Sequence, residues 1–248
     1  MNPPDAWNPL REFTDARIAL GRSGASLPTR EVLNFGLAHA RARDAIHQPF
    51  ASDQLVQPLA ELGLSTLTVR SAASDRHIYL NRPDLGRQLN EESRADLAAS
   101  GARPADLLLV IGDGLSSYAV QRQAVPLIRA LLPYLKTLGL SLAPVVLAHQ
   151  SRVALGDDIG ETLKARAVAI LIGERPGLSS PDSLGVYLTW QPHRQRLRPE
   201  GLSFDAAAFK LAWLLEQAFL RRLTGVRLKD ESDNPALHGK IKPLSQLK

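Results

Sequence analysis

Cysteine is absent from the 248 residues of this chain, which excludes disulfide bonds and thiolate metal sites. A chain without thiols suits a reducing compartment, so we expect a cytoplasmic protein. Long hydrophobic runs are absent too: residues 107–111 and 168–172 are among the longest, far below the roughly 18–20 residues that span a bilayer. The N-terminal residues also lack the basic and then apolar pattern of a secretory signal. We therefore expect a soluble protein without a membrane partner.

Aromatic residues are scarce, at 5% of the chain, and the basic residues are dispersed among acidic ones despite a formal net charge of +5. Nucleic-acid-binding domains usually gather lysine and arginine on one face and combine them with aromatic side chains. The sequence therefore predicts no nucleic acid partner. A solvated surface and complementarity to an acidic partner protein explain the positive charge equally well, and both interpretations stay open.

Residues 1–103 are predicted to form a smaller, mainly helical N-terminal subdomain. Apolar residues recur at helical spacing over residues 28–47, and Pro49 ends that helix. Residues 66–70 alternate in polarity as a strand does, and residues 81–86 are rich in turn-forming side chains. We expect this subdomain to pack on the rest of the chain.

Over residues 104–230 the sequence pattern differs: short apolar runs alternate with amphipathic stretches. Continuous apolar runs are typical of parallel strands that are buried on both faces. The sequence therefore predicts an α/β fold with a Rossmann-like, doubly wound and mostly parallel sheet. The polar residues 231–248 are expected to form a flexible tail. Strands are predicted at residues 107–111, 143–148, 167–172 and 186–190, and helices at 116–135, 157–165 and 204–223, the last ended by Gly225.

Three loops of this predicted sheet, at residues 112–117, 149–158 and 173–183, are candidate ligand sites, because ligands bind at the carboxyl ends of such strands. In the first loop, Gly112 and Gly114 have the spacing of a dinucleotide fingerprint, but Ser117 stands where a third glycine is expected. Glycines there can bring a phosphate or an amide close to a helix N-terminus. The alternative is a tight turn with Ser116 or Ser117 as the N-cap, and capping preferences favour it.

The loop at residues 173–183 places two charged side chains directly after a buried strand. Glu174 can accept hydrogen bonds from amide or hydroxyl groups of a ligand, and Arg175 can bind a phosphate or a carboxylate. An internal ion pair between the two is an equally good interpretation. In the loop at residues 149–158, we interpret Asp157 and Asp158 as an N-cap and a partner of the helix dipole.

The six histidines are scattered without the spacing of zinc ligands or of a nucleophile and its base. His149 is the one histidine at a ligand-facing strand end, and an ordinary surface histidine or one that anchors a loop explains it better than a ligand contact. The sequence therefore predicts no metal site and no self-contained set of catalytic residues.

Several segments resemble the small subunits of ethanolamine ammonia-lyases. The longest match joins residues 143–161, which contain Ser-Arg-Val, to residues 171–185, which contain Gly-Glu-Arg-Pro-Gly. The resemblance extends over residues 10–230, and it implies a subunit that functions only with a larger partner chain. Shorter matches lie at residues 14–24, 79–87, 113–116 and 198–202.

The resemblance implies an enzyme in which adenosylcobalamin lies between a large barrel subunit and this small one. The cobalt is held by the corrin ring, and cleavage of its bond to carbon supplies the radical that turns ethanolamine into acetaldehyde and ammonia. In such enzymes the substrate is bound mainly by the large subunit. The implied location is the cytoplasm, either free or within a bacterial microcompartment.

Two of the family's cobalamin contacts map onto Val153, within Ser-Arg-Val, and Glu174, within Gly-Glu-Arg-Pro-Gly. A third contact in the family is a cysteine that precedes the match at residues 198–202, and this chain is shorter there and has no cysteine. The alternative function is a binding module of this family that no longer binds cobalamin productively. A nucleotide-dependent enzyme built on the Gly112 turn is a third hypothesis, and the missing third glycine argues against it.

Overall fold

The computed structural model describes residues 7–14, 16–180, 182–191, 194–197, 204–222 and 228. The helices and strands predicted from the sequence are present, with ends that differ by a few residues. In chain order, the elements are η1 (Asn8–Glu12), α1 (Thr29–His47), α2 (Asp53–Glu61), β1 (Thr66–Arg70), α3 (Arg76–Asn81), η2 (Leu85–Arg87), α4 (Glu91–Ala99), β2 (Leu107–Gly112), α5 (Ser117–Leu138), β3 (Val145–His149), α6 (Leu155–Thr162), β4 (Ala167–Gly173), β5 (Leu184–Trp190), β6 (Arg194–Leu197) and α7 (Phe204–Arg221).

Six strands form one sheet in the order β1-β3-β2-β4-β5-β6. Strands β1, β3, β2 and β4 run parallel, whereas β5 is antiparallel to β4 and β6 is antiparallel to β5. The prediction of an α/β fold with a mostly parallel sheet is thus confirmed. The direction of β5 is not visible in the sequence, because a buried strand has the same continuous apolar pattern in either direction.

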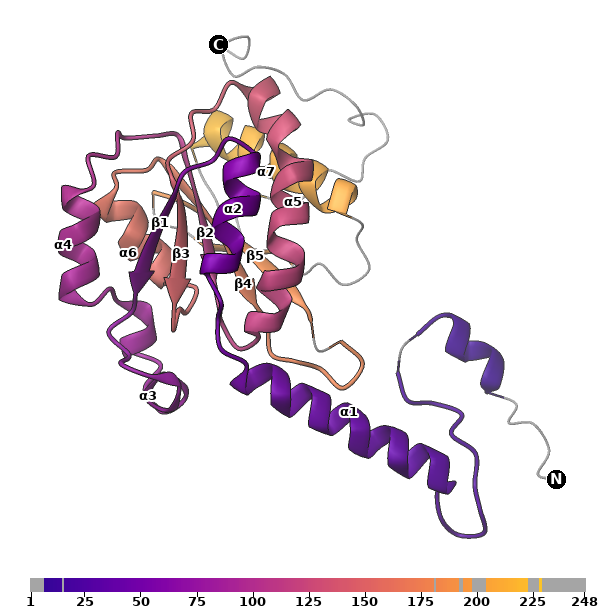
Figure 1. The fold of residues 1–248 in the computed structure, drawn as a ribbon. Coiled ribbons are helices and arrows are strands. Elements are labelled where there is room, and N and C mark those ends of the chain that lie inside the picture. The colour runs from indigo at the N-terminus through magenta and orange to yellow at the C-terminus, as the bar shows by residue number, and fades with distance from the viewer. Residues whose placement is uncertain are drawn as a thin grey trace.

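Helices cover both faces of the sheet (Figure 1). Side chains alternate between the two faces along a strand. Leu107, Leu109 and Ile111 of β2 therefore join the core beneath α2, α5 and α7. Leu108 and Val110 of the same strand join the core beneath α4 and α6. Because both faces are covered, every residue of β2, β4 and β5 is buried, which explains their continuous apolar runs.

A serine fixes the start of α5 directly after the turn that follows β2. The Oγ atom of Ser116 accepts a hydrogen bond from Ala119 N at 3.3 Å, so Ser116 is the N-cap. At the other end, Gly139 has a φ of 69° and its N–H bonds back to the last turn of the helix. The prediction of a tight turn with a serine cap is therefore confirmed.

Residues 1–103 contribute to the central sheet as well as to helices. Strand β1 is an edge strand that pairs with β3, α2 shares a core with α5, and α4 lies against β1 and α6. Helix α1 extends away from the sheet, with the N-terminal segment beside its far end (Figure 1). The boundary between a subdomain at 1–103 and a domain at 104–230 stays a prediction, and Gly225 and the tail at 231–248 lie outside the described residues. Among the described residues, no helix combines the length and the apolar character needed to cross a membrane.

Candidate functional site

The three candidate loops follow the carboxyl ends of β2, β3 and β4, so they lie together along one end of the sheet. We call this end the carboxyl edge, as distinct from the edge strands. Strand β2 lies between β3 and β4, so the chain leaves β2 for β3 through α5 and then returns past β2 to β4 through α6. Ligands in α/β proteins bind at such a change of direction, because the loops on either side of it separate. The candidate site is therefore the edge formed by residues 112–117, 149–154 and 173–180.

Glycines let the loop after β2 pack directly on the loop after β4. The N–H of Leu115 donates to Gly173 O at 2.9 Å. A Cβ at Gly173 would lie 1.9 Å from Ser116 O, and one at Gly114, which has a φ of +54°, would lie 2.2 Å from Gly173 O. At Gly112 the nearest neighbour of an added Cβ is a serine hydroxyl of the loop after β3, at 2.1 Å. The chain's own atoms thus occupy the space that a dinucleotide phosphate would need at this turn.

Asp113 joins the loop after β2 to the loop after β3. Its buried carboxylate accepts a hydrogen bond from Ser151 N at 2.8 Å on Oδ1 and from Gln150 N at 2.9 Å on Oδ2. Arg76 Nη1 lies 3.8 Å from Oδ2 and donates to Gly114 O at 2.7 Å. Burial raises the pKa of Asp113, whereas the two backbone N–H groups and the charge of Arg76 act in the opposite direction. Asp113 is therefore the anchor of the turn that follows β3.

Tyr79, on α3, is enclosed between two arginines next to this anchor. The guanidinium carbon of Arg76 lies 4.8 Å from the centre of the Tyr79 ring, and that of Arg152 lies 4.4 Å from it. The Tyr79 hydroxyl donates to Ser151 O at 3.0 Å, and Arg152 Nη2 donates to Tyr79 O at 3.0 Å. Burial raises the pKa of Tyr79 well above its usual range, and the charge of Asp113 adds to this effect. The hydroxyl therefore stays protonated and holds the loop after β3.

Polar side-chain atoms at this edge are buried without a hydrogen-bond partner. An unpaired buried polar group costs about 1–3 kcal/mol, so such atoms usually meet a ligand or solvent. Four such atoms lie here: two arginine nitrogens, which only donate, one glutamine oxygen, which only accepts, and one serine hydroxyl, which does both. A ligand rich in amide groups, which donate and accept, fits this set. The atoms are Arg76 Nη2, Gln150 Oε1, Ser151 Oγ and Arg152 Nε, four of the six such atoms in the described residues.

Val153 and Glu174 lie at the same edge and toward the same face of the sheet. Val153 is half-buried in the turn before α6 and packs against the core on the α4 and α6 side. Glu174 directly follows β4, and its Oε1 accepts a hydrogen bond from the hydroxyl of Tyr187, which belongs to the same core. Because β2 separates β3 from β4, the two loops start about 10 Å apart, which is twice the strand spacing. Arg175 is exposed, and among the ion pairs of the described residues none joins it to Glu174.

The prediction that Asp157 or Asp158 caps α6 is wrong. The helix begins at Leu155, and its cap residue is Ala154, which makes no side-chain cap bond. Both aspartates lie in the first turn, where the helix dipole favours negative charge. Asp158 Oδ2 also accepts hydrogen bonds from the N–H of residue 89 and from the guanidinium of residue 94, both at 2.8 Å. These partners are distant in the sequence, so the local pattern could not reveal them.

His149 anchors the start of α2 to the end of β3, as the sequence predicts for a loop-anchoring histidine. Its Nε2 lies 2.8 Å from Ser52 Oγ, and its ring lies 5.0 Å from the ring of Phe50. Burial lowers the pKa of His149, the charge of Arg70 lowers it further, and Asp53 acts in the opposite direction. The neutral ring can accept the Ser52 hydrogen bond at Nε2, whereas the protonated ring cannot.

The chain is expected to lose stability as the pH falls from 7.5 to 5.5, and His149 accounts for part of that loss. The folded state binds the His149 proton less readily than the unfolded state, so the stabilisation is complete above the unfolded pKa of about 6.5 and is lost below it. His149→Gln should flatten the dependence of the melting midpoint on pH in this range. His39→Gln, at an exposed position on α1, is the matched control, and parallel curves for parent and His149→Gln would contradict the assignment.

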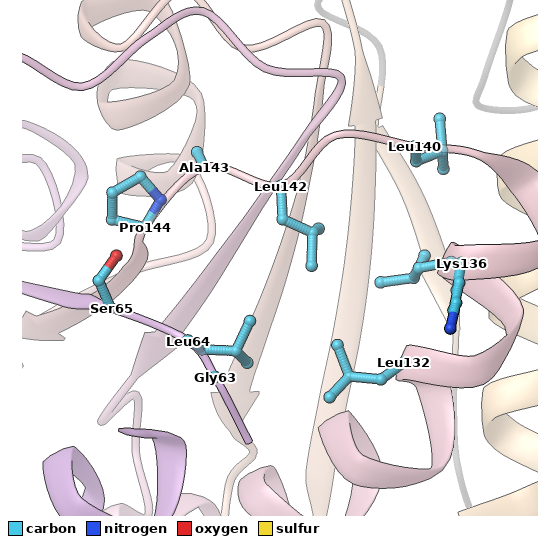
Figure 2. Close-up of a pocket in the computed structure, with 10 residues that line it drawn as sticks. Gly63, Leu64, Ser65, Leu132, Lys136, Leu140, Leu142, Ala143 and Pro144 are labelled. Carbon is cyan, nitrogen blue, oxygen red and sulfur yellow. The ribbon is translucent and has the colours of Figure 1, made fainter. Parts of the chain in front are cut away.

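The pocket in Figure 2 lies at the opposite, amino-terminal edge of the sheet. It has a volume of about 430 Å³ and is bounded by the end of α5 and by the segments that lead into β1 and β3. Leu64, Leu132 and Leu142 point into it, so its wall is mainly apolar (Figure 2). A second pocket, of about 660 Å³, runs along α6 and is lined by arginines and acids, of which Arg94 and Asp158 form an ion pair. Neither pocket includes Val153 or Glu174.

Comparison with known proteins identifies relatives over almost the whole chain. The family described as ethanolamine ammonia-lyase light chain (EutC) matches residues 4–229. The ethanolamine ammonia-lyase small subunit of Xanthomonas campestris pv. campestris is 51% identical and covers 95% of this chain and 91% of its own. The protein of the same name from Rhodopseudomonas palustris is 53% identical, with 90% and 89% covered. That from Pseudomonas aeruginosa is 50% identical, with 95% and 93% covered.

Proposed function

This chain belongs to the ethanolamine ammonia-lyase small-subunit family, and on that premise we propose that it holds adenosylcobalamin together with a large subunit. When bound, the cofactor supplies the radical chemistry that converts ethanolamine to acetaldehyde and ammonia. The name of the family implies the large partner, which we propose binds most of the substrate. The present chain then contributes no catalytic residue. It orients the cofactor and keeps solvent from one side of it, in the cytoplasm or within a microcompartment.

The shared position of Val153 and Glu174, at one edge and one face of the sheet, carries this proposal. A corrin is an apolar ring whose rim bears amide side chains. The apolar side chain of Val153 suits the ring, and the carboxylate of Glu174 suits an amide N–H on its rim. Tyr187 holds Oε1 of this carboxylate, so Oε2 is available to accept from the cofactor.

The unpartnered polar atoms of the same edge support the proposal independently. Gln150 Oε1 can accept from corrin amides, and Arg76 Nη2 and Arg152 Nε can donate to their carbonyl oxygens, because these three side chains are half-buried and can turn toward the cofactor, whereas Ser151 is fully buried. We also propose that residues 104–230 form a Rossmann-like cobalamin-associated domain, because helices cover both faces of the sheet and the chain changes direction at β2.

One feature favours the alternative of a binding module that no longer binds cobalamin productively. The family's third contact is a cysteine in a loop before residues 198–202, and this chain has no cysteine. Here β6 follows β5 after three residues and pairs with it, from Thr189↔Arg194 to Val186↔Leu197. The cysteine contact is thus missing from this segment, so Val153 and Glu174 would have to suffice.

Co-expression with the large subunit encoded in the same genome tests the proposal. The purified complex should release acetaldehyde from ethanolamine only when adenosylcobalamin is present. A stable complex that neither binds the cofactor nor turns over would support the alternative module. The absence of any complex would contradict the proposed function and favour a stand-alone module.

Replacing Glu174 with glutamine is expected to weaken the binding of adenosylcobalamin to that complex by about tenfold to a hundredfold. The amide nitrogen that replaces one carboxylate oxygen cannot accept from a corrin amide, and a hydrogen bond to a charged group is worth about 1.5–3 kcal/mol. Titration of the cofactor's visible absorbance measures the dissociation constant. Glu92→Gln, at an exposed position on α4, is the control, and equal constants for Glu174→Gln and the parent would remove Glu174 from the site.

A further inference from the structure

The N-terminal part of the chain carries an unusual concentration of exposed apolar side chains. Eight of the eleven exposed large hydrophobic residues in the described part of the chain lie within residues 7–37. Contiguous exposed apolar surface usually marks an interaction site. The N-terminal segment touches α1, where the guanidinium of Arg17 lies 5.4 Å from the ring of Phe35. The most exposed are Phe13 (83%), Leu33 (67%), Trp7 (66%) and Val32 (53%).

An apolar stripe runs along a different face of α1. Val32, Leu33 and Leu37 are 51–67% exposed, and Gly36 and Ala40 lie between and beyond them. These positions follow the spacing i, i+1, i+4, i+5 and i+8, so they share one side of the helix. A Cβ added at Gly36 would meet no atom within 4 Å, so a partner backbone can approach closely there.

Within the part of the chain that the structure describes, the contacts that attach helix α1 to the body of the protein lie near its C-terminal end. Its two buried residues are alanines in that part of the helix. Arg76 Nε donates to Ile46 O at 2.9 Å, and Ser117 Oγ donates to Gln48 O just beyond the helix. The helix has 19 residues, and a helix of this length draws most of its stability from packing an apolar face. The stripe lacks such packing in the described residues, so this apolar face of α1 is open to a partner.

The place where α1 is attached to the body of the protein indicates which partner contacts its apolar stripe. Arg76 also donates to Gly114 O, and Ser117 begins α5 directly after the loop that follows β2. Helix α1 therefore extends from the edge that holds Val153 and Glu174. A large subunit that closes this edge over the cofactor lies within reach of α1, whereas a second copy of this chain has no such reason to be there.

We propose that the stripe formed by Val32, Leu33, Gly36, Leu37 and Ala40 is a docking surface for the large subunit. The helix lies with this face in an apolar groove of the partner, a common mode of recognition for helices. This inference rests on the proposed function in one respect, because it takes the partner to be an ethanolamine ammonia-lyase large subunit.

The double variant Leu33→Ser/Leu37→Ser tests the docking surface, because both side chains are exposed and their loss should leave the fold intact. Its affinity for the large subunit, measured by titration calorimetry with the cofactor absent, should be at least about tenfold weaker than that of the parent. Leu220→Ser, which removes an exposed leucine from α7, should bind as the parent does. At saturating large subunit, the double variant should recover cobalamin-dependent acetaldehyde release.

The outcomes separate the docking surface from the proposed function. Equal affinities for the double variant and the parent overturn the docking surface, as does the absence of any complex with the parent. A parent chain that is dimeric alone, and a double variant that is monomeric but binds the large subunit normally, assign the stripe to a second copy and also overturn it. A tenfold loss in a complex that shows no cobalamin-dependent turnover supports the docking surface and contradicts only the proposed function.

Discussion

Replacing Gly173 with alanine is expected to lower the melting midpoint of the chain by roughly 5–10 °C. The added methyl carbon would lie 1.9 Å from Ser116 O and 2.7 Å from Asp113 O. Both neighbours are backbone atoms of the turn between β2 and α5, so neither can rotate away as a side chain would. Overpacking of this kind costs about 2–3 kcal/mol, and each kcal/mol shifts the midpoint of a chain of this size by about 2–4 °C. Thermal unfolding followed by circular dichroism measures the shift.

Gly36→Ala makes the same chemical change where nothing obstructs it, and it is the matched control. An added Cβ there meets no atom within 4 Å, and the position is in the interior of α1. Alanine in a helix interior is favoured over glycine by about 0.5–1 kcal/mol, so the midpoint should rise slightly. A Gly173→Ala chain that melts with the parent would show that the loops after β2 and β4 are not packed as described.

Asp113→Asn is expected to destabilise the chain by about 2–4 kcal/mol and to weaken cobalamin binding. The amide nitrogen of asparagine cannot accept one of the two hydrogen bonds that the carboxylate accepts from Gln150 N and Ser151 N. The substitution also leaves Arg76 without its counter-charge. Removing the charge also stabilises the folded state in one respect, because burial penalises the ionised carboxylate and raises the pKa of Asp113. We expect a different cost to exceed that gain: the asparagine NH2 group faces one of the two backbone N–H donors and leaves it unpaired in a buried site.

Chemical unfolding of parent and variant measures this balance, and Asp84→Asn is the control. Asp84 pairs with Arg82 on an exposed turn, so its substitution should leave the unfolding curve unchanged. A variant at residue 113 that is as stable as the parent would show that desolvation of the carboxylate dominates. A variant that is destabilised but binds cobalamin normally would show that Asp113 does not position the loop containing Val153.

The strands could be predicted because their burial leaves a local signal. Residues 107–111 and 168–172 are continuously apolar since both faces of β2 and β4 are covered by helices. The start of α5 was predictable for a similar reason, because a serine after a glycine turn is a local capping signal. The antiparallel direction of β5 and the true start of α6 were not predictable. The first leaves no periodic trace, and the second has no side-chain cap to mark it, because the cap residue is Ala154.

The sequence did not predict the anchor of the candidate site. Asp113 directly follows β2, whereas Arg76 and Tyr79 lie on α3, and no spacing rule links the aspartate to these two residues. One signal was present: a single carboxylate directly after a buried strand, in a loop already chosen as a candidate. Its partners could not be named, because they depend on where α3 packs against the end of the sheet.

By itself the sequence determined the fold class, the places of strands β1 to β5 and of helices α1, α5, α6 and α7, and membership of the family, because each of these depends on patterns among neighbouring residues or on long stretches of similar residues. Only the tertiary structure decided that Val153 and Glu174 share one edge and one face, that backbone fills the space at Gly114 and Gly173, and that the stripe on α1 is uncovered. These features depend on the order in which strands cross the sheet and on contacts between residues far apart in the chain. The local periodicity of the sequence carries no information about the strand order or about these distant contacts.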